Sequence, residues 1–145
     1  MCNGTPGSGE RSWRLYQKTL RALVRFSLPS LPAGCRVTAA RLRLYASSYK
    51  AGRTLDARSA ASAWQERAVT WRNQPATAGA AAAAVVGSRP GYLEWQVASS
   101  VQSMYSTANH GFVIRDRTEG GKGIEQAFNS REKRVNAPQL VITFG

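Results

Sequence analysis

The sequence predicts an all-β protein, a single-domain β-sandwich or jelly roll with at most one short helix. Several short stretches alternate apolar with polar residues, which is the period of a strand with one buried face. Turn-forming residues separate these stretches, and helical periodicity is almost absent. The 145 residues match one domain in length, and the 43% of hydrophobic residues is typical of a globular protein.

The first residues differ from the rest of the chain. Residues 1–12 are rich in Gly, Pro and Ser, so we expect them to be a mobile lead-in. The domain is then expected to span residues 21–145. Its clearest strand pattern lies in the first half, where Leu42 and Leu44 fall on one face and Arg41 and Arg43 on the other. The strands expected in this half cover residues 22–28, 37–45 and 54–59.

The second half shows the same pattern with one interruption. Residues 76–87 are alanine-rich, but five alanines between glycines cannot sustain a helix, so we expect a loop that runs into a weak strand at residues 85–86. Val101 and Tyr105 are spaced for one helical face, which predicts a short helix at residues 99–105. The other strands expected here cover residues 92–97, residues 112–115 and the segment after Pro138.

The chain is strongly basic. Lys and Arg number 20 against 8 Asp and Glu, a formal net charge of +12. Such an excess attracts polyanions, whether nucleic acid, anionic lipid surfaces or acidic polysaccharide. A compositional bias toward Ala, Gly and Arg explains the same excess equally well. Charge alone therefore does not identify a ligand.

Other features restrict the function. The two cysteines, Cys2 and Cys35, are too few for a disulfide scaffold and lack metal-ligand spacing, so Cys35 is interpreted as an incidental thiol. The single histidine, His110, argues against histidine-based metal sites and catalytic triads. No run of about 18 apolar residues and no signal peptide are visible, so no membrane insertion is expected. The protein is then either intracellular or a fragment of a longer chain.

Residues 64–75 hold two of the four tryptophans. Trp64 and Trp71 are seven residues apart, which fits two helical turns, but a turn at residues 65–67 followed by an extended segment ending before Pro75 fits better. The two indoles could stack on sugar rings or lie in the core. The neighbouring Val69 and Pro75 favour the core.

The order of these motifs resembles the DNRLRE domain, a carbohydrate-binding-module-like β-sandwich of secreted and cell-surface bacterial proteins. The resemblance covers residues 21–145 and rests on the ordered set rather than on any single motif. The set comprises Arg-Ala-Leu-Val-Arg-Phe at 21–26, Leu31 to Gly34, the strand at 37–45, Trp64-x-Glu66, Val69-Thr70-Trp71-x-Asn73-x-Pro75, Trp95-x-Val97, Asn109-x-Gly111-Phe112, Phe128-x-Ser130-Arg131-Glu132 and Pro138-x-Leu140.

The resemblance implies a non-catalytic module of an extracellular or wall protein, with a catalytic domain in a longer parent chain. Some members are similar to modules that bind alginate, an acidic polysaccharide, and the net charge of +12 is compatible with such a ligand. Members begin with an extra strand that residues 1–20 do not match well, so the first strand is altered or lost here. Its loss would expose an edge of the sheet.

The candidate carbohydrate-binding residues lie on the basic strand and its neighbours. They are Arg41, Arg43 and Tyr45, with Arg58 and Arg115 as less certain members. A solvated strand face is the competing interpretation. We expect Arg43→Ala to weaken retention by polyanions without changing the melting temperature.

The remaining motif residues are expected to be structural. They are Trp64, Glu66, Trp71, Asn73, Arg131 and Glu132. Glu66 and Arg131 suggest an ion pair rather than a catalytic set. No cofactor or metal is expected, since Asp116, Glu119 and Glu125 do not form a calcium-binding pattern. A spacer or adhesion module without a sugar ligand, and a nonspecific polyanion binder, remain alternatives. A nucleic-acid ligand is the weakest of these, because Tyr45 is the only aromatic residue beside the basic strand.

Overall fold

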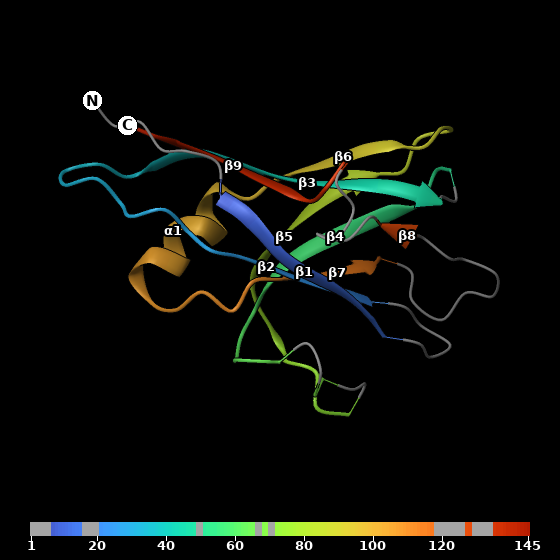
Figure 1. Ribbon diagram of the computed structural model, residues 1–145, viewed down its shortest axis with the longest axis horizontal. Helices are drawn as coiled ribbons and strands as arrows, with labels where there is room; N and C mark the ends of the chain where they lie inside the picture. The colour runs from blue at the N-terminus through green and yellow to red at the C-terminus, as the bar shows by residue number, and fades with distance from the viewer. Residues whose placement is uncertain are drawn as a thin grey trace.

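The computed structural model shows a β-sandwich of two antiparallel sheets with one short helix (Figure 1). The structure describes residues 7–15, 21–48, 51–65, 68–69, 72–117, 127–128 and 135–145, with the backbone alone for 7–15, 47–48 and 127–128. The elements are β1 (Gly7–Leu15), β2 (Arg21–Phe26), β3 (Val37–Ser48), β4 (Thr54–Ala60), β5 (Thr77–Val85), β6 (Gly91–Gln96), α1 (Ala98–Ser106), β7 (Phe112–Asp116), β8 (Ala127–Phe128) and β9 (Gln139–Phe144). The predicted fold class is confirmed.

The two sheets share one strand. The first sheet has the order β5-β4-β7-β2-β1, and the second contains β9, β3 and β6, with β8 on the end of β3. The beginning of β1 pairs with β9 at Gly7 and Ser8, while its remainder pairs with β2. A strand therefore lies within the stretch for which the sequence suggested a lead-in or an altered first strand, and it joins the edges of both sheets.

The core fills the space between the sheets because inward residues alternate along the strands. Leu42 and Leu44 of β3, Leu140 of β9 and Trp95 of β6 are fully buried. They face Phe26 and its neighbours from the first sheet. The Trp95 indole N–H donates to the carbonyl oxygen of Leu55 on β4 at 2.9 Å, so the indole links the sheets through both packing and a hydrogen bond.

Two expectations about the strands are wrong. Residues 77–85 form β5 rather than a loop, because their backbone pairs with β4 from Thr54 to Ala60. Ala82 and Ala84 of β5 pack against the core. Alternation with the inward Val24 and Phe26 places Leu23 on the side of β2 where solvent is expected, but Leu23 is completely buried. Trp64 and Val69, from the described part of residues 61–76, pack over Leu23 on this side of the first sheet.

Helix α1 closes one end of the sandwich, where the sequence predicted a short helix. Val101 and Met104 point into the core, and Tyr105 donates from its hydroxyl to the carbonyl oxygen of Pro29 at 2.6 Å. The Gln102 side chain accepts the backbone N–H of Val37, at the start of β3. These contacts fix the helix against the β2–β3 connection. Among the described residues, no helix is both long and apolar enough to cross a membrane.

Cys35, in the β2–β3 connection, is bonded in a disulfide. The sequence contains one other cysteine, Cys2. The interpretation of Cys35 as an incidental thiol is therefore wrong. Spacing along the chain could not show this bond, because a disulfide depends on the approach of two Cα atoms in the folded structure.

Candidate functional site

The outer face of the second sheet carries the basic strand predicted from the sequence. Because side chains alternate along β3, Arg41, Arg43 and Tyr45 point away from the core. The pairing of β3 with β6 and β9 sets other polar residues beside them. We call this surface the arginine–tyrosine face, and it consists of Arg41, Arg43, Tyr45, Tyr92, Glu94 and Gln139.

Arg43 lies at the centre of the arginine–tyrosine face and contacts residues of three strands. Its Nη1 donates to Gln139 Oε1 of β9 at 2.6 Å, and its Nε lies 2.8 Å from Glu94 Oε1 of β6. The second contact is an ion pair without the geometry of a hydrogen bond. The guanidinium carbon also lies 4.3 Å from the ring centroid of Tyr92, a cation–π distance. These contacts hold the Arg43 side chain in one position.

Arg41 is the more accessible of the two arginines. Its side chain is 47% exposed, against 29% for Arg43. Its Nη1 donates to the same Glu94 oxygen at 3.3 Å, so a single carboxylate is shared by two guanidinium groups. Within this trio one positive charge is uncompensated. A guanidinium has five N–H donors, which leaves Arg41 with donors for an anionic group arriving from solvent.

The two tyrosines form an aromatic pair at one end of the face. The rings of Tyr45 and Tyr92 meet edge to face, with centroids 5.4 Å apart and an angle of 83° between the planes. Such a pair is rigid and amphipathic, as aromatic groups at binding surfaces commonly are. Tyr92 is held further by its hydroxyl, which donates to the carbonyl oxygen of Ala137 at 3.0 Å. The pair therefore offers an ordered, partly apolar surface beside the arginines.

Arg58 and Arg115 lie elsewhere. The pairing of Asp56 with Arg115 and of Arg58 with Val113 places both arginines on the outer face of the first sheet, on the opposite side of the sandwich. The structure thus divides the five predicted binding residues into a group of three and a group of two. The Nε of Arg58 is buried and has no hydrogen-bond partner among the described residues.

The carboxylates that the structure describes are all engaged by arginine. Asp56 receives two hydrogen bonds from Arg117, at 2.8 and 3.3 Å, and Asp116 receives two from Arg53, at 2.7 and 2.8 Å. These bonds raise the pKa of both arginines above the usual value. The carboxylate of Glu94 is likewise paired, with Arg41 and Arg43. Within the same part of the chain, no group of three or more metal-ligating side chains occurs.

The segment at residues 61–76 packs against the first sheet, as expected for Trp64. Trp64 is 8% exposed and contacts Leu23, Val69 and Val113. Its indole N–H donates to the carbonyl oxygen of His110 at 2.6 Å. The Trp64 ring therefore packs against the first sheet and is not available to a sugar.

A turn also forms where the sequence predicted one. The backbone N–H groups of Ala68 and Val69 both donate to the Gln65 carbonyl oxygen, at 3.0 and 2.8 Å. Asn73 donates to the carbonyl oxygen of Ala68 at 2.9 Å, a contact within this turn region. The other motif residues, Glu66, Trp71, Arg131 and Glu132, lie outside the described residues, as do Glu119 and Glu125 of the discounted calcium pattern.

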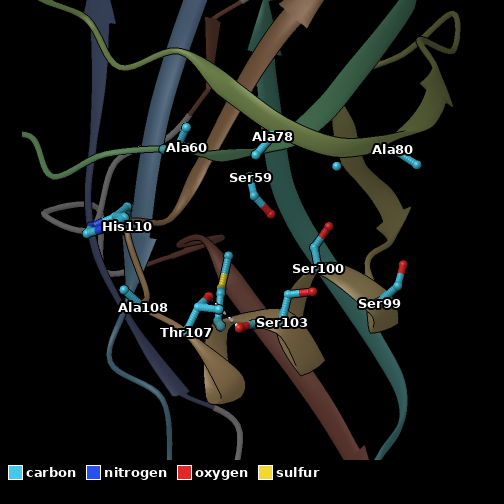
Figure 2. Close-up of a pocket in the computed structure, with 13 residues that line it drawn as sticks. Ser59, Ala60, Ala78, Ala80, Ser99, Ser100, Ser103, Thr107, Ala108 and His110 are labelled. Carbon is cyan, nitrogen blue, oxygen red and sulfur yellow. Dashed lines mark hydrogen bonds between the residues drawn. The ribbon is translucent and has the colours of Figure 1, made fainter.

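The structure also contains a cleft that sequence reasoning missed. It has a volume of about 590 Å³ and lies between α1 and strands β4 and β5 (Figure 2). Hydroxyl groups from Ser59 on one side and from Ser99, Ser100 and Ser103 on the other line it, with His110 at one end. The available signal was three serines within five positions of the helix. That signal is weak, because serine is common on any exposed helix face.

Comparison with known proteins identifies a family. The family model for carbohydrate-binding module family 96 matches residues 9–144. The match begins inside β1 and ends at the last residue of β9, so it covers the whole sandwich. No curated protein matches the chain. The DNRLRE label remains a resemblance.

Proposed function

Because the chain belongs to carbohydrate-binding module family 96, we propose that it binds an acidic polysaccharide such as alginate, without catalysis, on the arginine–tyrosine face. The observation that carries the proposal is that Arg41 and Arg43 share the single carboxylate of Glu94, on a face that also carries the tyrosine pair. Family membership supports a carbohydrate ligand. The acidic class of the ligand is our inference from the charge.

The chemistry of the face suits a uronate chain. A carboxylate on a sugar ring can accept two N–H groups of one guanidinium, which gives both charge and direction. Arg41 has the donors and the exposure for this contact. Arg43 is already held by Glu94, Gln139 and Tyr92, so its role is to keep the neighbouring groups in position.

The tyrosine pair supplies the apolar part of the contact. The C–H face of a pyranose ring packs on aromatic carbon much as other apolar groups do. Tyr45 is half-buried and stands beside Arg43 on the same strand. A polysaccharide that runs along β3 would therefore meet the charged donors of Arg41 and the aromatic surface of Tyr45 in succession.

We further infer that the protein acts outside the cell, as part of a longer secreted or cell-surface protein with a catalytic domain. The disulfide at Cys35 supports this location, because disulfides persist in oxidising compartments and are rare in the cytosol. Structural polysaccharides such as alginate are also extracellular. A module that holds such a polymer would keep an attached enzyme close to its substrate.

The test is affinity electrophoresis through gels that contain alginate, polygalacturonate or a neutral xylan. We expect the two acidic gels to retard the protein more strongly than the neutral gel does. Arg41→Gln should weaken retention by alginate up to roughly fivefold, the equivalent of about 1 kcal/mol for one exposed ion pair. Arg72→Gln is the matched control. It removes the same charge from an exposed position in the segment over the opposite sheet.

A second candidate function is supported by the basic groups on both sides of the sandwich. Arg58, Arg115 and Arg117 lie on the first sheet, far from the arginine–tyrosine face. A protein that binds any polyanion through such scattered charge would be retarded equally by DNA and alginate, with the same steep dependence on salt. Equal effects of Arg41→Gln and Arg72→Gln would support this alternative. No retardation by any polymer would support a spacer module instead.

A further inference from the structure

The cleft beside α1 is lined by three serine hydroxyl groups that have no hydrogen-bond partner among the described residues. The side chains of Ser59, Ser100 and Ser103 form no hydrogen bond with any described residue. Ser59 projects from β4 on one side, while Ser100 and Ser103 project from the helix on the other, and all three point into the same space (Figure 2). Each hydroxyl can both donate and accept a hydrogen bond.

The cleft differs in charge from both basic faces. Among the described residues that line it there is no Lys, Arg, Asp or Glu, and His110 is the one titratable group. A charged ligand would lose hydration on entering without gaining a charged partner. An uncharged ligand rich in hydroxyl groups would exchange its water for the serine side chains at little cost.

The size and the apolar part of the lining also limit the ligand. A volume of about 590 Å³ lies within the range of roughly 300–1,000 Å³ that is typical of small-molecule sites. Met104 and alanine methyl groups from β4 and β5 provide apolar contacts between the hydroxyls. This mixture complements a sugar ring, which has apolar C–H faces and a polar rim.

We propose that the cleft is a second carbohydrate site, which binds a short uncharged saccharide. The site is separate from the arginine–tyrosine face, which lies on the outside of the other sheet. This inference rests on the proposed function only in that both take the ligand to be a carbohydrate. A hydroxyl-lined cleft would bind neutral sugar units whether or not the arginines bind a uronate.

The test is an NMR titration of the ¹⁵N-labelled full chain with four neutral disaccharides, namely cellobiose, maltose, xylobiose and mannobiose, and with a dimannuronate. We expect at least one neutral disaccharide, at millimolar concentration, to shift the backbone amide signals of Ser59, Ser100 and Ser103 along a saturable curve. The signals of Arg41 and Arg43 should not move in that titration. Dimannuronate should leave the cleft signals unchanged.

Two variants separate the cleft from the rest of the helix. Ser103→Met fills the cleft and should abolish the saturable shifts. Ser106→Met makes the same change on the same helix, at an exposed residue outside the cleft lining, and should retain them. Thermal unfolding checks that both variants are folded. Three results would overturn the proposal: no shift with any neutral disaccharide, shifts with dimannuronate alone, or unchanged binding by Ser103→Met. Failure of alginate to retard the protein in gels would leave this measurement unaffected.

Discussion

At the scale of single residues, the structure explains why the motif Asn109-x-Gly111-Phe112 has a glycine two positions after the asparagine. Its φ of 80° is in the left-handed region, and a Cβ there would overlap the carbonyl oxygen of Val24 on β2. Asn109 holds the same turn, since its Nδ2 donates to the Phe26 carbonyl oxygen at 2.6 Å and its Oδ1 accepts the Gly111 N–H at 3.1 Å. The turn therefore brings β7 against β2.

Gly111→Ala should destabilise the protein by more than the about 1–3 kcal/mol that left-handed backbone strain alone costs. The added Cβ would also overlap the Val24 carbonyl oxygen, and this overlap increases the loss. Gly34→Ala is the control. Gly34 has a similar φ of 74° but nothing within 4 Å of the added Cβ. Urea denaturation measures both changes. Equal losses of stability would show that overlap with β2 is unimportant.

Arg43 and Arg41 should differ in their effect on stability. The sequence suggested that Arg43→Ala would leave the melting temperature unchanged, but the structure gives Arg43 contacts with Glu94, Gln139 and Tyr92. Its loss should lower stability by about 1–2 kcal/mol. Arg41→Ala removes one exposed pair and should cost less than about 1 kcal/mol. Differential scanning calorimetry compares the two, and a smaller shift for Arg43→Ala would contradict this account of the face.

At the scale of elements, the segment at residues 61–76 acts as a cover for the first sheet. Trp64, Val69, Ala60, Leu23 and Val113 form a small apolar cluster outside the sandwich core. Arg25 adds a cation–π contact, with its guanidinium carbon 5.5 Å from the Trp64 ring. This cover explains how the apolar side chain of Leu23 can lie on the outer side of β2 and still be shielded from water.

Trp64→Ala should cost about 3–5 kcal/mol, since it leaves a cavity over Leu23 and Val113 and frees the His110 carbonyl oxygen. Val85→Ala, at a position that is 63% exposed, should change stability by less than about 0.5 kcal/mol. Chemical denaturation of both variants tests the packing. A near-neutral Trp64→Ala would mean that the segment does not stabilise the sheet.

The elements also show what could be predicted from the sequence. Alternation located β3, β6 and β9 and assigned the inward side chains of β3, because one face of the strand meets the core and the other meets solvent. The same rule did not predict the burial of Leu23, because residues distant in the sequence, Trp64 and Val69, cover the outer side of β2 at that position. It failed for β5 as well, because an alanine run carries little local preference for a strand and pairing with β4 decides its conformation.

The candidate site was predicted only in part, for a similar reason. Arg41, Arg43 and Tyr45 share a strand face, so alternation grouped them correctly. Their partners Glu94 and Gln139 come from strands whose register is set in three dimensions. Register likewise placed Arg58 and Arg115 on the opposite sheet, and the cleft depends on how α1 docks.

At the scale of the whole molecule, the disulfide at Cys35 constrains the unfolded chain. Reduction, or Cys35→Ser, should lower the free energy of unfolding by about 2–4 kcal/mol, as is typical for loss of one native disulfide. Thermal unfolding with and without a reductant measures this effect. An unchanged melting temperature on full reduction would show that the bond contributes nothing to stability, and would remove one support for an extracellular location.

The distribution of charge over the molecule decides between specific and general binding of polyanions. Basic groups lie on both outer faces, but the arginine–tyrosine face also carries the Tyr45–Tyr92 pair. A ligand that is recognised through aromatic contacts and not through charge alone should therefore bind to the arginine–tyrosine face.

The most direct test is an NMR titration of the full chain with an alginate oligosaccharide at moderate salt. The account predicts shifts of the amide signals of Arg41, Arg43, Tyr45, Tyr92 and Glu94, with those of Arg58 and Arg115 unmoved. Shifts confined to Arg58 and Arg115, or no shift at any residue, would contradict the proposal that the arginine–tyrosine face binds an acidic polysaccharide.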